Sequence, residues 1–370
     1  MEELFGERPD YLSRQLLTYI GNKRALLGFI GKAVDRIRRR LAKDRLTIVD
    51  LFSGSGVVSR YFKQFAAHLL ANDLEPYSEV TNRCYLTNES EIDLAALKEL
   101  HTQLTTRLSH GPLQSGIIAR NYAPQDDSAI KRGERVFYTT RNALYLDTAR
   151  LLINEVPEEL RHFFIAPLLS EASVHANTSG VFKGFYKDAR TGFGKFGGSA
   201  GNALTRILGE INLPFPVFSR FDCPVRVRRQ DANELVRELS EFDLAYIDPP
   251  YNQHPYGSNY FMLNLLADYQ EPEEISRISG IPINWRRSNY NKPRRAAETL
   301  RDLVANTNAR YLLVSFNSEG FLDTEQMTSI LQKIGTVEVL ETRYNTFRGS
   351  RNLRNRSAHV TEYLYLVERA

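Results

Sequence analysis

Apolar positions along the chain follow two alternating patterns. Short runs rich in β-branched and aromatic residues predict buried strands, and longer segments with apolar residues at helical spacing predict helices. The predicted strands are residues 46–52, 68–73, 225–230, 243–248, 310–317, 336–344 and 360–367. The predicted helices are residues 22–40, 57–65, 76–85, 232–239, 258–267 and 323–333. This alternation predicts an α/β fold built on a doubly wound, mostly parallel sheet.

The last two predicted strands depart from the alternation. Only a polar, Arg-rich stretch, residues 345–359, separates them, and it is too short for a crossover helix. We therefore expect these strands to pair antiparallel. The prediction is a seven-stranded sheet, mostly parallel, with an antiparallel C-terminal hairpin.

A long stretch of about 150 residues separates the second and third predicted strands. A connection of that length must contain structure of its own. Helical patterns at 93–108, 140–153 and 161–175 predict a mainly helical insertion. The expected domains are a main domain of residues 1–90 and 221–370 and an inserted domain of residues 91–220.

The end of the insertion mixes glycines, aromatics and lysines, in residues 177–187 and 192–198. Aromatic rings stack on bases and lysines bind phosphates, so this segment is a candidate nucleic-acid contact. The residues in question are Lys183, Tyr186, Lys187 and Lys195. A flexible surface loop is the alternative.

Composition is that of a folded globular protein, with 42% hydrophobic and 25% charged residues. The net charge of +4 is only mildly basic, so the distribution of charge matters more than its sum. The cluster at 36–40 ends a predicted helix and complements its dipole. The clusters at 183–195 and 343–356 lie in segments rich in Gly, Asn and Ser, which makes them the better candidates for phosphate contacts.

Two cysteines, Cys84 and Cys223, lie far apart without a metal-binding spacing, so neither a disulfide framework nor a cysteine zinc site is expected. The acidic N-terminus lacks a signal-peptide pattern, and no apolar run is long enough to span a bilayer. We therefore expect a cytoplasmic protein that does not bind membranes.

The motif Asp248-Pro249-Pro250-Tyr251 closes the fourth predicted strand. In open α/β sheets ligands bind outside the carboxyl ends of strands, so these residues are predicted to face an active site. The following polar and aromatic residues are suited to gripping a flat heteroaromatic ring. A strand-ending turn with Asp248 as a helix cap is the alternative.

A glycine turn, Phe52-Ser53-Gly54-Ser55-Gly56, connects the first predicted strand to a helix. Such turns let the backbone approach a nucleotide-like ligand. Asp73 ends the second strand and is placed to bind ribose hydroxyls, although a helix N-cap is equally consistent. These features predict an adenosine-containing ligand without separating a nicotinamide dinucleotide from S-adenosylmethionine.

Four motifs in this order resemble the adenine-N6 DNA methyltransferases of the D12 class, which include the Dam and FokI-type methylases. The resemblance rests on Tyr19-Ile20-Gly21-Asn22-Lys23, Phe52-Ser53-Gly54-Ser55-Gly56, Asn72-Asp73 and Asp248-Pro249-Pro250-Tyr251. The insertion lies where that family carries its target-recognition region. Residues 177–182 and Asn259-Tyr260 are closer to the FokI-type branch.

The resemblance implies a Rossmann-like methyltransferase that uses S-adenosyl-L-methionine and acts on double-stranded DNA. The implied cofactor-binding residues are Tyr19, Gly21, Lys23, Phe52, Gly54, Gly56, Asp73, Asp231 and Asp248. Asp231 would border the cofactor's adenine, but it fits a helix N-cap equally well. Further DNA contacts are expected from Asn259, Tyr260 and the basic loop residues Arg348, Arg351, Arg354 and Arg356, for which exposed loop charge is the alternative.

The expected chemistry follows from the weak nucleophilicity of the adenine amine, whose lone pair is delocalised. Asp248 would accept one N6 hydrogen, and the carbonyl of Pro249 or Pro250 the other. Tyr251 would stack on a base swung out of the duplex. No metal is expected, because the methyl donor is itself activated.

Other activities remain open. Cytosine-N4 methylation usually has Ser in place of Asp248, and a protein-glutamine methylase would carry Asn there; RNA adenine methylation, a silent DNA-binding regulator and a nicotinamide dehydrogenase are further alternatives. A restriction-modification setting would add an endonuclease that acts on the same site without a stable complex. The protein is expected to act as a monomer.

Overall fold

The computed structural model describes residues 6–198, 201, 203–251, 253, 255–345 and 359–370. Within this part of the chain seven strands form one sheet, in the order β3-β2-β1-β4-β5-β7-β6. The strands are β1 (Leu46–Asp50), β2 (Ala66–Asp73), β3 (Val225–Arg229), β4 (Phe242–Ile247), β5 (Ala309–Asn317), β6 (Gly335–Asn345) and β7 (His359–Arg369). The first five pair in parallel, and β7 lies antiparallel between β5 and β6. The predicted fold class is confirmed.

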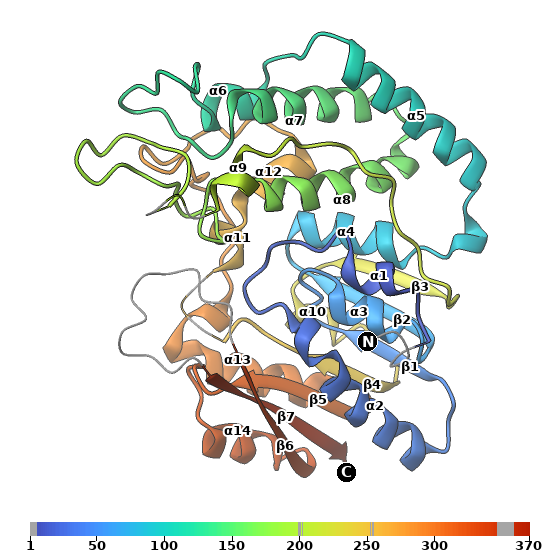
Figure 1. The fold of residues 1–370 in the computed structure, drawn as a ribbon. Helices are drawn as coiled ribbons and strands as arrows, with labels where there is room; N and C mark the ends of the chain where they lie inside the picture. Colours follow the sequence, from blue (N-terminus) through green and yellow to red (C-terminus); the bar gives the residue numbers. More distant parts are fainter. Residues whose placement is uncertain (1–5, 199–200, 202, 252, 254, 346–358) are drawn as a thin grey trace.

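Helices connect these strands and pack on both faces of the sheet (Figure 1). In the N-terminal part they are α1 (Pro9–Ser13), η1 (Lys23–Leu26), α2 (Leu27–Leu41), α3 (Val57–Phe62), α4 (Pro76–Leu86) and η2 (Glu89–Glu91). The inserted region contains α5 (Leu94–His110), α6 (Ile117–Tyr122), α7 (Thr140–Ile153), α8 (Glu158–Val174) and α9 (Leu204–Leu208). The remainder contains α10 (Ala232–Leu235), α11 (Tyr256–Asn259), α12 (Phe261–Asp268), η4 (Asn289–Asn291), α13 (Pro293–Asn306) and α14 (Thr324–Leu331). The helices α2, α3 and α4 lie in the core of one face of the sheet, and α10, α13 and α14 lie in the core of the other.

Two helical predictions need correction. The segment 258–267 is not one helix, because Tyr260 interrupts it with φ −121° and ψ 25°. The helix α13 was missed, although its buried residues Ala296, Leu300, Leu303 and Val304 follow helical spacing. The charged residues of α13 outnumber these four apolar positions, so the apolar face of the helix is hard to recognise in the sequence.

The helices of the inserted region share a hydrophobic core with the sheet domain. In Figure 1, α5, α6 and α7 lie at the top, α8 and α12 lie beneath them, and α4 lies between these helices and the sheet. The pairs α4–α8, α12–α8 and α12–α4 are in contact. Buried residues from both parts, among them Phe164 of α8 and Tyr77 of α4, belong to a single cluster. The insertion is therefore anchored broadly on the sheet domain.

Both cysteines are buried and carry free thiols, as expected. Across the described ranges, none of the helices combines the length and apolarity that crossing a bilayer would require.

Candidate active site

The carboxyl ends of β1, β2, β4 and β5 meet at one edge of the sheet, because these strands run parallel in adjacent positions. The connection from β1 leads to β2 on one side, and β4 lies on the other, which makes a topological switch point. A pocket opens there. It is lined by Tyr19, Gly21, Lys23, Phe52, Gly54, Asp73, Asp231, Asp248 and Pro250, together with residues that were not predicted.

Residues of the glycine turn line one side of this pocket. Gly54 and Gly56 adopt φ values of 51° and 77°, which strain any residue with a Cβ atom. Gly54 N donates to the Asp73 carboxylate over 2.8 Å, so the turn and the end of β2 are held together. Gly56 does not line the pocket; a Cβ there would lie 2.9 Å from Asn82 Oδ1. Its role is to let α3 begin close against α4.

Asp73 lines the pocket and accepts hydrogen bonds from the amides of Gly54 and Glu75. Burial raises its pKa. The alternative of a helix N-cap is wrong, because Glu75 occupies the cap position of α4. A carboxylate offers about four lone-pair sites, so these two backbone bonds leave capacity for hydroxyl donors.

Asp231 combines the two interpretations given to it. Its carboxylate caps α10 by accepting from Asn233 N at 2.8 Å and Glu234 N at 3.4 Å. It also lines the pocket, so the residue is both a helix cap and a pocket residue.

Tyr19 lies in a group of stacked tyrosines. Its ring centroid is 5.1 Å from that of Tyr256 and 4.6 Å from that of Tyr260, with interplanar angles of 19°. Tyr260 is fully buried, and its hydroxyl accepts a hydrogen bond from Ile20 N over 2.6 Å. Tyr19 and Tyr256 line the pocket, so the stack forms one of its walls.

Asp248 follows the last residue of β4 and has 16% of its side chain exposed. Burial raises the pKa of Asp248 to about 6, and the charge of Lys23 opposes that rise. Lys23 Nζ is 3.2 Å from Asp248 Oδ1 and 2.5 Å from Oε1 of Glu362. Burial would lower the Lys23 pKa, but the two carboxylates outweigh it and raise that pKa well above its usual value. Lys23 is thus a buried ammonium ion shared by two acids.

The remaining motif residues are placed differently from one another. Pro250 lines the pocket, whereas Pro249 is buried and is not among the lining residues. Tyr251 is 9% exposed and packs against Phe316 at a centroid distance of 5.0 Å, with its hydroxyl accepting from Asn317 Nδ2. Lys23 Nζ lies 5.4 Å from the Tyr251 ring centroid, so this ring borders the acid–lysine cluster.

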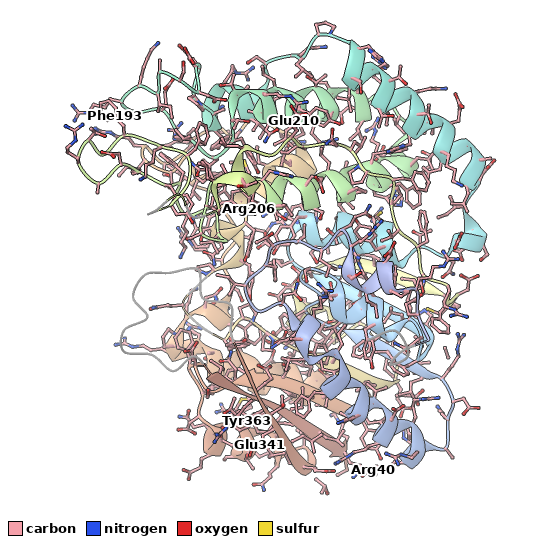
Figure 2. The ribbon with its side chains drawn as sticks, in the orientation of Figure 1. Arg40, Phe193, Arg206, Glu210, Glu341 and Tyr363 are labelled. Atoms are coloured by element: carbon pink, nitrogen blue, oxygen red, sulfur yellow. The ribbon has the colours of Figure 1, made fainter. Side chains whose placement is uncertain are left out.

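The basic, aromatic segment of the insertion forms a compact loop. Asn177 anchors it by donating to the carbonyls of Val136 and Lys195 over 2.7 and 2.8 Å. Lys183 and Lys187 are exposed, and Tyr186 and Lys195 are half-buried. Figure 2 shows Phe193 at the outer end of this loop. The exposed Lys183 and Lys187 are accessible to a large ligand, so the nucleic-acid contact stays a prediction.

The structure does not favour direct DNA contacts by the two residues predicted after the catalytic motif. Asn259 is 2% exposed and Tyr260 is fully buried, so neither presents its side chain to solvent. Instead, Asn259 O accepts from Phe182 N over 2.7 Å, which ties the insertion to α11. The loop arginines Arg348, Arg351, Arg354 and Arg356 lie outside the described residues.

Several pocket residues were missed from the sequence. Burial raises the pKa of Asp50, at the end of β1, to about 7, and the hydroxyl of Ser59 donates to it over 2.6 Å. Burial also raises the pKa of Glu75 to about 7. Tyr290, which packs edge-on against Phe52 at 5.3 Å, and Arg286 come from the long segment between α12 and α13. Asp50 carried a signal, since it ends an apolar strand directly before the glycine turn.

Comparisons with known proteins agree with this arrangement. A type II methyltransferase of Neisseria lactamica, M.NlaIII, is 29% identical over 95% of this chain and 99% of its own length. M.CviAII, a type II methyltransferase of Paramecium bursaria Chlorella virus 1, is 27% identical over 94% and 97% of the two chains. M.FokI of Planomicrobium okeanokoites is 26% identical over 95% of this chain, which corresponds to 53% of that protein.

The family model for D12 class N6 adenine-specific DNA methyltransferases matches residues 19–191 and 210–330. These ranges include the tyrosine stack, the glycine turn, Asp73 and the Asp-Pro-Pro-Tyr motif, which the structure brings to one pocket. The chain belongs to the D12 class of N6 adenine-specific DNA methyltransferases.

Proposed function

We propose that this protein transfers a methyl group from S-adenosyl-L-methionine to N6 of an adenine swung out of double-stranded DNA, as the modification enzyme of a restriction-modification system. The observation that carries the proposal is Asp248 itself. It lines the pocket, and its neighbouring donors, Lys23 and Ser315, leave part of the four or so lone-pair sites of the carboxylate available. An acceptor of this kind is what a reacting amine requires.

The chemistry of the pocket residues supports the proposed cofactor. Gly21 and Gly54 let the backbone approach closely, since a Cβ at either would lie 3.2 Å from a tyrosine hydroxyl. Asp73 offers acceptors for ribose hydroxyls, and Asp231 marks a polar end near β3. Phe52 and Tyr290 present aromatic surface for a purine. When bound, S-adenosyl-L-methionine supplies a methyl group activated by a positively charged sulfur.

The protein's own groups orient the amine. In the proposed geometry the Asp248 carboxylate accepts one N6 hydrogen and the carbonyl of Pro249 or Pro250 accepts the second, which frees the nitrogen lone pair for bond formation. After transfer the nitrogen carries one proton too many, and Asp248, with a pKa of about 6, is suited to take it. Each well-placed acceptor contributes on the order of 3 kcal/mol of transition-state stabilisation.

The proposal assigns DNA recognition to residues 91–220, with Lys183, Tyr186, Lys187 and Lys195 facing the duplex. The type II names of the relatives support a site-specific activity with a cognate endonuclease acting on the same sequence. A monomer is sufficient, because the pocket is complete within one chain. Tyr251 would reach the extruded base only after leaving its contact with Phe316.

Product analysis tests the function directly. The purified protein is incubated with methyl-labelled S-adenosyl-L-methionine and unmethylated bacterial genomic DNA, and the DNA is digested to nucleosides. Label in N6-methyl-deoxyadenosine supports the proposal, and sequencing then gives the target site. Label in N4-methylcytosine, or label only when RNA replaces DNA, would contradict it.

A further inference from the structure

Glu362 is a buried acid in the middle of the reaction centre that no sequence motif marked. It lies on β7 opposite Asn317 of β5, and it is fully buried. Its Oε1 accepts a 2.6 Å hydrogen bond from the Ser315 hydroxyl and the 2.5 Å bond from Lys23 Nζ. The strand therefore brings a second carboxylate to the lysine that contacts Asp248.

Burying two carboxylates beside one ammonium ion does not favour the stability of the fold. One ammonium ion is enough to neutralise one carboxylate, so the pair of acids leaves a surplus negative charge in a poorly solvated place. Groups of this kind cluster at functional sites, because a replacement by apolar residues would be as stable or more stable. The unfavourable burial of the Glu362 carboxylate therefore indicates a functional role in the site.

The geometry shows what that task is. The shorter contact of the ammonium, 2.5 Å, goes to Glu362, whereas its contact with Asp248 Oδ1 is 3.2 Å. Asp248 gains the nearby positive charge, and Lys23 and Ser315 do not fill the four or so lone-pair sites of its carboxylate, so an N–H donor can still bind there. Without Glu362, the ammonium would turn to Asp248 and occupy those lone pairs.

We propose that Glu362 is a positioning residue that holds Lys23 away from full engagement with Asp248 and so keeps the catalytic carboxylate available for the adenine amine. The groups that face Asp248 are Lys23 of η1, Asp50 at the end of β1, Tyr246 of β4, Tyr251, Tyr256 of α11, and Glu362 of β7. Among these, Glu362 is the group that competes for Lys23. The inference rests on the proposed function for its catalytic consequence.

The test compares Glu362→Gln with Glu368→Gln, a matched change on the same strand at a side chain that is 54% exposed and lies 3.7 Å from Arg40. We expect Glu362→Gln to lower kcat on the order of 10²-fold, as small misplacements of reacting groups do. Removal of the nearby negative charge also moves the acidic limb of the kcat/KM profile to lower pH. The control should leave both unchanged.

A second readout does not depend on activity. In cofactor-free protein with ¹³C-enriched lysine side chains, the Lys23 signal is assigned by its loss in Lys23→Arg and titrated at high pH. Glu362→Gln should lower the pH at which Lys23 loses its proton, and Glu362→Asp should restore part of the difference.

These readouts separate the possible failures. An unchanged Lys23 titration in Glu362→Gln overturns the inference, as does a lower kcat that follows only a lower Tm and leaves the acidic limb in place. Absence of labelled N6-methyl-deoxyadenosine with the unaltered protein would count against the proposed function alone, because the lysine titration still decides the role of Glu362.

Discussion

Asp248 combines burial with a neighbouring ammonium ion, and these two influences act on its carboxyl group in opposite directions. Burial raises its pKa, and Lys23 limits the rise, so that the group titrates near pH 6. It is therefore ionised at neutral pH while remaining a better proton acceptor than an exposed aspartate.

Replacement of this carboxylate should separate binding from chemistry. We expect Asp248→Ala to lower kcat at least 10²-fold, because it removes an acceptor used in the transition state. The dissociation constants for DNA and cofactor should change little. Single-turnover assays and equilibrium binding measure the two effects, and substantial residual turnover would refute the role.

The pH dependence follows from the same group. The folded pKa of Asp248 is raised above that of an exposed aspartate, and the ionised form is the active one, so kcat/KM should be retained above about pH 6 and fall as the pH drops through that value. A pH–rate profile measured at constant ionic strength checks this expectation. A flat profile down to pH 5 would mean that Asp248 does not act as the ionised acceptor.

Individual residues differ in how far the sequence could place them. Asp73 and Asp248 were identifiable because each ends a strand, and parallel strands deliver their ends to one edge. Glu362 was not, because its contact with Lys23 joins positions at opposite ends of the chain. The burial of Tyr260 was also hidden, since spacing does not tell which aromatic of a loop faces solvent.

At the scale of elements, the path from β1 through the glycine turn to α3 sets the shape of the pocket. Gly56 has a φ of 77° and lies against Asn82 of α4. The turn thus joins the strand edge to a helix of the neighbouring layer. The strand predictions succeeded here because β-branched runs bounded by polar ends are easy to recognise. The helix α13 was missed because its charged residues outnumber its buried apolar ones.

A methyl group at this turn should destabilise the protein. We expect Gly56→Ala to cost about 1–2 kcal/mol from the left-handed backbone alone, with a further loss from the contact to Asn82. Gly184→Ala is the matched control, because no atom lies within 4 Å of a Cβ there. Denaturant unfolding of the two variants gives the comparison, and equal stabilities would contradict the assigned role of Gly56.

At the scale of the whole molecule, the position of one basic loop suggests where DNA would lie. The loop that contains Lys183 and Lys187 projects on the opposite side of the molecule from α5 (Figure 1). DNA bound at the pocket and the insertion would lie closer to this loop than to α5.

Salt dependence should distinguish the two faces. Loss of one phosphate contact in Lys187→Ala should reduce the slope of log Kd against log salt concentration by about one. Lys98→Ala, an exposed lysine on α5, should leave the slope unchanged. Identical slopes for both variants would place the duplex elsewhere.

The shared core of the insertion and the sheet domain bears on how sequence specificity can change. Since α8 is buried against α4 and α12, a recognition region exchanged between related enzymes would have to bring matching side chains on both sides of that boundary. Exchange of residues 91–220 as a cassette would leave mismatched cavities and clashes. If the insertion reads the target sequence, as proposed, new specificities are more accessible through substitutions in exposed loops than through transplantation of the whole insertion.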